Sequence, residues 1–301
     1  MSAELMETLR RQLGDRARFN EPLAGHTTWG IGGPAWCFCR VQSAAEAVAV
    51  AGAARVAGMA VKALGRGSNL LVGDRGFAGV VLSLAGELAT SRVDGATIAA
   101  GGGAALPSLV RLAAEQGLAG LEWAAGIPAS LGGAIANNAG ASGGQMSELI
   151  ETVELLLADG ALQTLAGHDL GGGYRRGGLP AGAVVLGARL RLTFDDQAAV
   201  AARTRAILAR RKATQPLGAA TAGSVFKNPP GDHAGRLIEA AGCKGWRQGG
   251  AMVSERHANF IENAGKASAA DVLALMERVR ARVRAACGVE LEAEVEVVGD
   301  V

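Results

Sequence analysis

The segment AGSVFKNPPG, residues 222–231, gathers groups that could handle a proton. Ser224 follows a glycine, and Lys227 and Asn228 stand three and four residues after it. A serine hydroxyl is a very weak acid, so it donates a proton at neutral pH only when neighbouring groups polarise it. Spacing alone favours an ordinary turn serine, because glycine and proline flank it. Whether Ser224 donates a proton therefore depends on the rest of the chain.

A glycine-rich stretch, GRGSNL at residues 65–70, has the composition of a phosphate-binding loop. It does not match the Rossmann fingerprint G-x-G-x-x-G, because Leu70 replaces the last glycine and a strand pattern follows. Glycines beside small polar residues nevertheless let backbone N–H groups approach a pyrophosphate without side-chain collision. The residues suited to this approach are Gly65, Gly67, Ser68 and Asn69.

A second stretch of this kind is GIPASLGGA, residues 126–134. Its small residues Gly126, Ser130, Gly132 and Gly133 would permit a similarly close approach. Either loop alone is explained by turn formation, whereas two such loops in one β-rich region leave turn and ligand site equally open.

The composition favours a globular protein that acts on small molecules. The 301 residues carry 30 Lys and Arg against 28 Asp and Glu, a formal net charge of +2 that would not recruit nucleic acid or an acidic membrane. The four cysteines, Cys37, Cys39, Cys243 and Cys287, do not fit a zinc spacing, and we expect reduced packing residues and no metal site. The amino terminus is charged throughout, unlike a signal peptide, and no uncharged run is long enough to span a membrane, so a cytoplasmic location is expected.

Hydrophobic periodicity predicts the elements that must position these loops. Strands are expected at 36–41, 61–64, 72–84 and 95–104, with helices at 1–16, from Ser43 and Glu46 to about 58, and at 106–117. Residues 120–144 are too glycine-rich for a regular element. Two strands, 150–158 and 183–194, and a helix over 198–213 follow.

The last hundred residues show a different pattern, so a boundary is expected near the 198–213 helix. A helix is predicted over 234–242, a strand over 258–263, and a helix that begins at Ser268 and Asp271. Its apolar stripe is Val272, Leu275, Met276, Val279 and Val283. Strict alternation predicts a strand over 289–298, with Glu290, Glu292, Glu294 and Glu296 on one face.

Seven segments in this order resemble the UDP-N-acetylenolpyruvoylglucosamine reductase family, flavoenzymes that make UDP-N-acetylmuramate for peptidoglycan. They are HTTWGIGGPA, LGRGSNLLVGDRGFAGVVL, GLEWAAGIPASLGGAIANNAG, YRRG, RRKATQPLGAATAGSVFKNP, AGRLIEAAGCKGWRQGGAMVSERHANFIEN and LEAEVEVVG. A generic flavin oxidase of the same fold would share the first three segments and lack the last four. The length is similar to that of the shorter subtype, which lacks an inserted tyrosine loop.

This resemblance implies an α+β fold: an FAD-binding domain of the vanillyl-alcohol-oxidase (PCMH) type, made of two subdomains, and a smaller C-terminal α/β substrate-binding domain. The expected divisions are an N-terminal helix over 1–20, an FAD-binding domain over 21–195 with subdomains of about 21–82 and 83–195, and a substrate-binding domain over 196–301.

The family's reaction moves a hydride from NADPH through non-covalent FAD, by way of flavin N5, to C3 of an enolpyruvyl group. The negative charge that develops at C2 spreads into the carboxylate, and a proton then reaches C2. The resemblance implies that Arg175 binds the substrate carboxylate and that Ser224 donates the proton to C2. It also implies that Glu294 assists the same step, by positioning the substrate or relaying the proton. Glu296 stands where relatives commonly carry a basic residue.

The same resemblance assigns the binding residues. FAD would contact Gly65, Arg66, Gly67, Ser68, Asn69, Gly126, Ile127, Pro128, Ser130, Gly132, Gly133 and Asn138. The UDP-sugar would contact Tyr174, Lys227, Asn228 and His257, although a purely structural His257 is equally compatible. A monomer is slightly favoured.

Two other functions would explain part of the sequence. An FAD-linked oxidase or dehydrogenase of a small hydroxy acid would share the scaffold, but it would leave GSVFKNP and the terminal L-x-x-E without a role. A non-catalytic flavin or nucleotide-sugar binding protein would not need Arg175, Ser224 and Glu294 together.

Overall fold

The computed structural model describes residues 2–300, which form two compact units, each with its own core. The first unit comprises residues up to 20, 36–66 and 78–210, and the second comprises 21–35, 67–77 and those from 211 onward. The second unit thus takes two short segments from the amino-terminal third of the chain.

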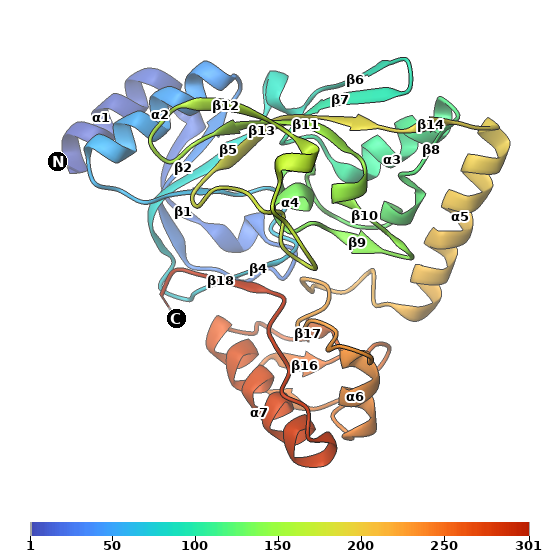
Figure 1. Ribbon diagram of the computed structural model, residues 1–301. Helices are drawn as coiled ribbons and strands as arrows, with labels where there is room; N and C mark the ends of the chain where they lie inside the picture. The colour runs from blue at the N-terminus through green and yellow to red at the C-terminus, as the bar shows by residue number, and fades with distance from the viewer. Residues whose placement is uncertain (1, 301) are drawn as a thin grey trace. The chain divides into compact units, whose positions relative to one another are not determined.

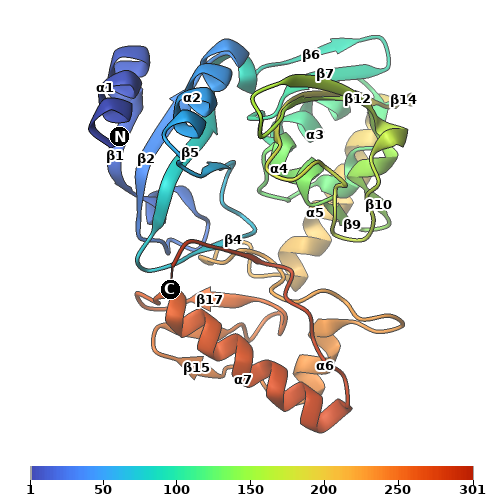
Figure 2. The same ribbon diagram turned by 60° about the vertical axis from the view of Figure 1, so that its left-hand side comes forward.

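The first unit contains a four-stranded sheet covered by two helices. Its strands lie in the order β1 (Ala17–Pro22), β2 (Pro34–Val41), β5 (Phe77–Leu84) and β3 (Val61–Ala63). Figures 1 and 2 both show α1 (Ser2–Leu13) and α2 (Ala44–Val56) side by side. Leu5 and Leu9 of α1 and Val50 of α2 pack into one cluster with Cys37 and Cys39 of β2. The cysteines are therefore packing residues, as the sequence predicts.

The start of α2 forms only half of the predicted capping box. Ser43 Oγ accepts a hydrogen bond from the Glu46 N–H at 3.2 Å. The Glu46 carboxylate accepts from the Gln42 N–H at 2.7 Å and pairs with Arg16 at 2.6 and 2.8 Å. The Arg16 guanidinium holds the pKa of Glu46 below its usual range. A distant cation has therefore taken the carboxylate that the local motif assigns to the cap.

A five-stranded antiparallel sheet forms the rest of the first unit. Its strands lie in the order β12 (Leu162–Ala166), β11 (Ile150–Leu156), β13 (Val184–Arg191), β7 (Thr97–Gly101) and β6 (Ser91–Asp94). Val153 pairs with Ala188, which pairs in turn with Ala100, so small and β-branched residues meet across the sheet. Helices α3 (Leu106–Glu115) and α4 (Leu131–Ala136) pack into the same core.

The smaller elements of the first unit connect these layers. The short strands are β8 (Leu118–Ala119), β9 (Gly140–Ala141), β10 (Gly144–Gln145) and β14 (Thr193–Phe194). The 3₁₀ turns are η1 (Gly14–Arg16), η3 (Gly86–Ala89), η4 (Glu122–Ala124), η5 (Met146–Glu148) and η6 (Gly167–Asp169). Helix α5 (Gln197–Thr214) leads out of this unit.

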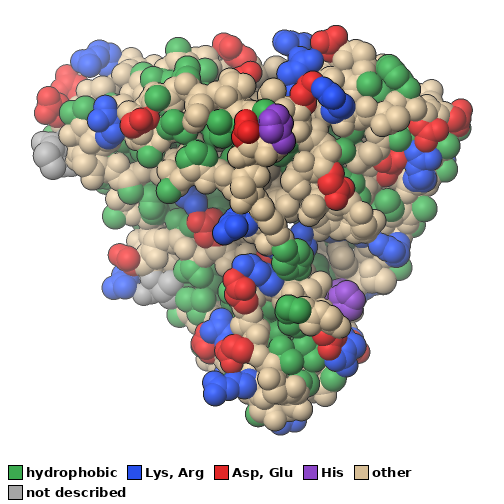
Figure 3. Space-filling model, viewed as in Figure 1, with side chains coloured by type: hydrophobic (Ala, Val, Ile, Leu, Met, Phe, Trp, Pro, Cys, Tyr) green, Lys and Arg blue, Asp and Glu red, His purple; other side chains and the backbone are tan. Residues whose placement is uncertain are grey.

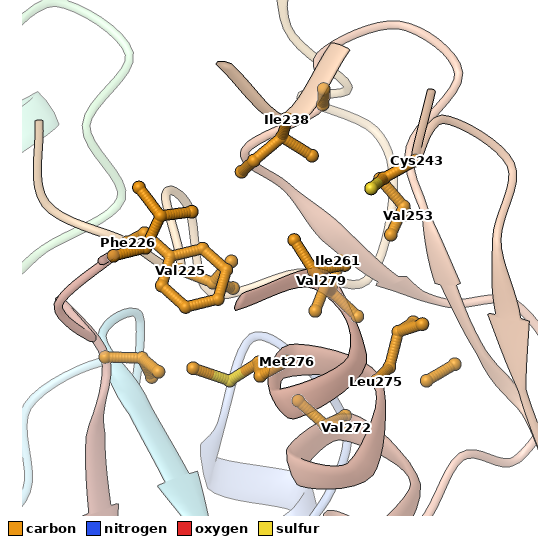
Figure 4. Packing of buried hydrophobic residues seen from close by; sticks show 14 of the residues in the cluster. Val225, Phe226, Ile238, Cys243, Val253, Ile261, Val272, Leu275, Met276 and Val279 are labelled. Carbon is orange, nitrogen blue, oxygen red and sulfur yellow. The ribbon is translucent and has the colours of Figure 1, made fainter. Parts of the chain in front are cut away.

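The second unit is built on a long helix and a three-stranded sheet. It holds η2 (Leu23–His26), α6 (Ala234–Ala240), α7 (Ala269–Cys287), and the sheet β15 (Arg247–Gln248), β16 (Ala251–Val253) and β17 (Ile261–Asn263). Ser268 and Asp271 form the predicted capping box of α7. The predicted stripe of α7 is buried at every position, and Figure 4 shows Val272 and Met276 in one cluster with Val225 and Phe226. The Ser224 loop is thus anchored in this core.

A separate parallel pair joins the early and late parts of this unit. Strand β4 (Leu70–Val72) pairs with β18 (Glu296–Val298), with Leu70 opposite Glu296. The predicted strand over 289–298 is wrong for its first seven residues, which lie outside regular strands. Leu291 and Val295 are nevertheless buried, as the alternation predicts.

Other expectations from the sequence also differ from the structure. The expected N-terminal helix over 1–20 ends at Leu13, and η1 and the start of β1 occupy the rest of that segment. Residues 120–144, expected to lack regular elements, contain η4, the helix α4 and most of the β9–β10 pair. Strand β12 was not predicted, because exposed polar residues interrupt its apolar pattern. Short elements of this kind are fixed by their partners and not by their own periodicity.

Charges are distributed evenly over the face in Figure 3, where Lys and Arg side chains alternate with Asp and Glu. None of the helices in the described part of the chain has the length and apolar character that crossing a membrane requires. Within residues 2–300, no group of three or more His, Cys, Asp or Glu side chains is arranged to hold a metal ion.

Candidate active site

The backbone around Ser224 is extended and held on both sides. Gly223 adopts φ 78°, a left-handed conformation that glycine reaches without strain. Ser224 then forms a β-bridge with Phe260, and its side chain is half-buried. Val225 and Phe226, only 1% exposed, fix the loop in the core of the second unit. Ser224 is therefore a residue of an anchored extended segment and not of a loose turn.

Glu294 lies beside this segment. The Glu294 N–H donates to the Val225 carbonyl at 2.8 Å, and the Lys227 N–H donates to the Glu292 carbonyl at 2.8 Å. A β-bridge joins Phe226 to the residue between the two glutamates. The structure thus brings together Ser224 and Glu294, which are 70 positions apart in the sequence.

Burial separates Glu294 from the other three glutamates of this segment. Its side chain is half-buried, whereas Glu290, Glu292 and Glu296 are exposed. Alternation in the sequence does not distinguish the four residues. The structure gives Glu294 alone the partly desolvated position in which a carboxylate interacts strongly with a neighbour.

Asn69, from the predicted phosphate loop, is tied to the Glu294 segment within the second unit. Its Nδ2 donates to the Glu294 carbonyl at 3.2 Å, and the Glu296 N–H donates to the Asn69 carbonyl at 3.0 Å. These bonds lead directly into the β4–β18 pair. The loop before β4 and the segment that carries Glu294 are therefore positioned by the same hydrogen bonds.

Lys227 and Asn228 have protein partners in the structure. Lys227 Nζ forms an ion pair with Glu292. Asn228 Oδ1 accepts a hydrogen bond from the Ala234 N–H at 3.0 Å and so caps the start of α6. Both residues lie within four positions of Ser224, so they also shape the loop that carries it.

His257 is half-buried next to the Ser224 segment. Its Nδ1 accepts a hydrogen bond from the Asn259 N–H at 3.3 Å, and its ring meets the edge of Phe260 with centroids 4.8 Å apart. Gly235 of α6 packs closely against the ring, since a Cβ at this position would lie 3.0 Å from His257. Burial lowers the pKa of His257 below its ordinary value, and the charge of Lys244 adds to this effect.

We expect His257 to stay neutral at pH 7 and to titrate below pH 6.5. A folded-state pKa below the unfolded value means that the unfolded chain binds more protons, so the free energy of unfolding falls as the pH drops below about 6.5. An NMR titration of the His257 ring measures the midpoint, with the urea-unfolded protein as the reference. A folded midpoint at or above that of the unfolded chain would contradict this assignment.

In the first unit, Arg175 stands in a tight two-residue turn. Gly173 and Arg176 exchange backbone hydrogen bonds of 2.8 and 3.0 Å across it, and Arg175 adopts φ 56°. Arg175 Nη1 donates to the Gly140 carbonyl at 2.8 Å, and its Cζ lies 5.2 Å from the centre of the exposed Tyr174 ring. Left-handed backbone at a non-glycine residue is uncommon and often marks a functional position.

Asn138 holds this turn in place. Its Nδ2 donates to the Gly173 carbonyl at 3.0 Å and to Gln145 at 3.4 Å, and its Oδ1 accepts from the Ser147 N–H at 2.9 Å. The side chain is buried and φ is 40°. Asn138 therefore positions the Arg175 turn. From the sequence, only a flavin contact is expected for this residue.

The two glycine stretches meet within the first unit. A Cβ on Gly65 would lie 2.1 Å from Ser130 Oγ, so only glycine fits here. Ser130 caps α4 by accepting a hydrogen bond from the Gly133 N–H at 3.2 Å, and the Gly132 N–H donates to the Gly102 carbonyl at 2.7 Å. The first stretch presents backbone at this point because Gly65 has no side chain, which suits a cradle for FAD.

Replacing Gly65 by Ala is expected to weaken FAD binding by about tenfold or more. The new methyl group collides with Ser130 Oγ, which cannot move without losing its hydrogen bond to Gly133. The ratio of flavin to protein absorbance after dialysis measures this. Gly52→Ala is the control, because the site is open and a helix interior gains about 0.5–1 kcal/mol from alanine. Equal flavin content in both variants would refute the role of Gly65.

Gly67 begins the second unit's part of this loop. It adopts φ 59°, and a Cβ would lie 2.4 Å from the His26 carbonyl oxygen. Its own carbonyl accepts hydrogen bonds of 3.3 Å from the N–H and the hydroxyl of Thr28. Conformation and crowding both require glycine at this position.

Comparison with known proteins identifies the family. Residues 215–298 match the model for the C-terminal domain of UDP-N-acetylenolpyruvoylglucosamine reductase, and residues 35–166 match an FAD binding domain. The chain is 48% identical over 282 residues to the UDP-N-acetylenolpyruvoylglucosamine reductase of Heliobacterium modesticaldum, covering 93% of this chain and 90% of that relative. The chain belongs to the UDP-N-acetylenolpyruvoylglucosamine reductase family.

Further relatives agree with this assignment. UDP-N-acetylenolpyruvoylglucosamine reductase 2 of Symbiobacterium thermophilum is 46% identical over 99% of this chain and 96% of its own length. The crystal structure of the reductase (MurB) from Thermus caldophilus superposes with a TM-score of 0.82 at 40% identity, covering 94% of this chain and 98% of that one. The glucose dehydrogenase Phl p 4.0202 has a TM-score of 0.51 at 17% identity over 63% of this chain and 44% of its own, a likeness of fold alone. The α+β fold with an FAD-binding domain is thus confirmed.

The remaining expected FAD contacts of the family lie at or near the surface. Arg66 and Pro128 are exposed, Ser68 and Ile127 are half-buried, and Gly126 adopts φ 81°. Their roles in cofactor binding remain predictions.

One further residue, not expected from the sequence, lies next to the Ser224 segment. Asn259 is 2% exposed, and its side chain contacts the backbone of Phe226. The sequence does contain an indication of this role: in SERHANFIEN, residues 254–263, a polar residue stands between Ala258 and Phe260. A buried asparagine among apolar residues needs hydrogen-bond partners, and this need alone indicates a structural role.

Proposed function

We propose that this chain, with FAD bound, uses NADPH to reduce UDP-N-acetylglucosamine enolpyruvate to UDP-N-acetylmuramate, a step of peptidoglycan precursor synthesis. The observation that carries this proposal is the direct hydrogen bond between Glu294 and the residue after Ser224. This contact lies inside the segment that matches the family's C-terminal domain. It holds Glu294 against the residue that follows Ser224, and the second half of the reaction would need Ser224 and Glu294 together.

Arg175 would bind the enolpyruvyl carboxylate. The turn holds its backbone, and the hydrogen bond to Gly140 restricts the guanidinium. Arg175 would therefore lose little conformational entropy when the substrate binds. A planar guanidinium donates to both oxygens of a carboxylate and stabilises the charge that spreads into it during hydride addition. The adjacent Tyr174, exposed in the structure, would contact the UDP-sugar.

Ser224 would give the proton to C2. Its segment is anchored by Val225 and Phe226, so the backbone that carries the hydroxyl keeps a fixed position. Glu294, half-buried beside it, would position the substrate or relay the proton. Lys227, Asn228 and His257 would line the site for the UDP-sugar.

The glycine stretches would hold FAD without a covalent bond. The pyrophosphate would lie on the backbone of residues 65–69, and the flavin would contact the 126–133 loop and Asn138. Bound FAD would supply hydride transfer from NADPH to C3 of the substrate. We further propose a cytoplasmic monomer that does not bind nucleic acid, with the domain divisions given by the sequence near residues 20 and 195.

Anaerobic spectroscopy tests this proposal directly. The purified protein should show flavin absorbance, NADPH should bleach it, and UDP-N-acetylglucosamine enolpyruvate should then restore it rapidly. A hydroxy-acid oxidase would instead be bleached by its hydroxy acid, and a non-catalytic binding protein would show neither step. Failure of the enolpyruvyl substrate to restore the colour would refute the proposed function.

A further inference from the structure

Asn259 replaces a missing stretch of β-ladder next to the Ser224 segment. Its Oδ1 accepts a hydrogen bond from the Phe226 N–H at 3.0 Å, and its Nδ2 donates to the Phe226 carbonyl at 2.8 Å. One side-chain amide thus binds both backbone groups of a residue that is 1% exposed. A neighbouring strand would normally supply these two bonds.

The chain around Asn259 shows why its own backbone cannot supply them. The Val225 N–H donates to the Asn259 carbonyl at 2.9 Å, so this backbone group is already occupied. The Asn259 N–H donates to His257 Nδ1, and the Phe260 N–H turns back to the His257 carbonyl at 2.9 Å. Because the backbone turns at this point, only a side chain reaches Phe226.

The same residues lie next to the groups assigned to proton transfer. Ser224 bridges to Phe260 on the Asn259 side, and the Val225 carbonyl accepts from the Glu294 N–H on the opposite side. The Ser224 segment is therefore held between Asn259 and Glu294. Without the amide, the buried N–H and C=O of Phe226 lose their partners and must move toward others.

We propose that Asn259 is a positioning residue that fixes the direction of the Ser224 hydroxyl relative to Glu294. This inference rests on the proposed function, in which Ser224 gives a proton to the substrate. Asn259 acts through the Phe226 backbone and does not itself touch the reacting atoms. Its loss is expected to slow the proton-dependent half of the reaction and to leave NADPH oxidation unchanged.

The substitution Asn259→Asp gives a test that a purely structural role would not pass. A neutral carboxyl group has one O–H donor and one carbonyl acceptor, the same pair as the amide, whereas a carboxylate has acceptors only. Burial raises the pKa of the introduced carboxyl group. At high pH the carboxylate faces the Phe226 carbonyl and should slow recolouring by about 100-fold, and as the pH falls the rate should recover to within about tenfold of the wild type.

Other ionisable groups near this segment could also change the rate with pH. Their contribution cancels when the variant is compared with the wild type at each pH. The charged groups on the elements packed against Asn259 are His257, Lys227, Glu292, Glu294, Arg236, Glu239 and Lys244. All of them are present in both proteins. The ratio of variant to wild-type recolouring rates therefore reports the introduced carboxyl group.

Asn263→Asp is the matched control. Asn263 lies in β17 of the same unit, donates from Nδ2 to the Trp29 carbonyl at 3.0 Å and accepts from the Ala267 N–H at 2.8 Å. It is the same chemical change at another satisfied amide, away from Phe226. It should lower thermal stability and should slow neither half-reaction selectively.

The experiment is a stopped-flow measurement on the holoenzyme. The Asn259→Asp variant is held at low pH, where a larger fraction of its carboxyl group is neutral, and is then mixed with substrate into buffer of high pH, so that the rate is measured before the protein can unfold. Repulsion between the carboxylate and the Phe226 carbonyl should push the two segments apart, so hydrogen exchange at the Val225 amide, which donates to the Asn259 carbonyl, should accelerate relative to the wild type at high pH only. This second readout reports the backbone contact independently of catalysis.

Three outcomes separate the claims. Selective, pH-dependent slowing with faster exchange at the Val225 amide supports the positioning role. A pH-independent ratio, or equal slowing of both half-reactions, overturns that role while the wild type still recolours and the proposed function stands. A wild type that the enolpyruvyl substrate does not recolour overturns both.

Discussion

The variant Ser224→Ala is expected to be bleached by NADPH at a near-normal rate and to be recoloured by the enolpyruvyl substrate about 10²-fold to 10⁴-fold more slowly than the wild type. This loss equals about 2.7–5.5 kcal/mol in activation free energy. The reason is that the methyl group cannot give a proton to C2, while the backbone that anchors Val225 and Phe226 is unchanged. Stopped-flow absorbance of the flavin measures the two half-reactions separately.

Ser224→Cys is the companion variant. A thiol still carries a proton and is more acidic than a hydroxyl, so this variant should recolour faster than Ser224→Ala. If Ser224→Ala slowed both half-reactions equally, the cause would be misfolding or FAD loss, and the serine would not be the proton donor.

The second large effect is expected for Arg175→Ala. Removal of a preorganised donor from a developing negative charge typically costs about 10²-fold to 10³-fold, and Arg175 is held by its turn and by Gly140. Recolouring by substrate should slow by this factor, and the apparent Kd of the substrate should rise, because the carboxylate is bound before hydride addition as well. Bleaching by NADPH should change little.

Arg176→Ala is the matched control, since Arg176 closes the same turn and its side chain is exposed. The cationic variant Arg175→Lys should fall between alanine and the wild type, because an ammonium group keeps the charge without the planar fork. Equal effects at Arg175 and Arg176 would show that only the net charge of the turn matters.

Local patterns predict the longer helices of this chain, although they miss the short helix α4. The stripe from Val272 to Val283 describes a buried face of α7, and its capping box at Ser268 and Asp271 forms as expected. These signals lie within a few residues of one another, so the sequence contains them in readable form. Ser43 likewise caps the start of α2 as predicted. Only the Glu46 carboxylate differs from the predicted capping box, because Arg16 binds it.

Residues with distant partners could not be predicted in this way. Asn138 acts on a carbonyl 35 residues later, and Asn259 acts on a backbone 33 residues earlier. Glu294 resembles its neighbouring glutamates until its burial is known. The family resemblance pointed to Ser224, Arg175 and Glu294, but the residues that hold them in place required the structure.

The parallel pair β4–β18 imposes an order on biosynthesis. Strand β4 is translated early, whereas Glu296 and Val298 of β18 are among the last described residues. The hydrogen bond from the Glu296 N–H to Asn69 can form only after the ribosome has passed this position. The loop before β4 therefore gains this partner only after Glu296 has been translated, so its final position depends on a contact between residues far apart in the sequence.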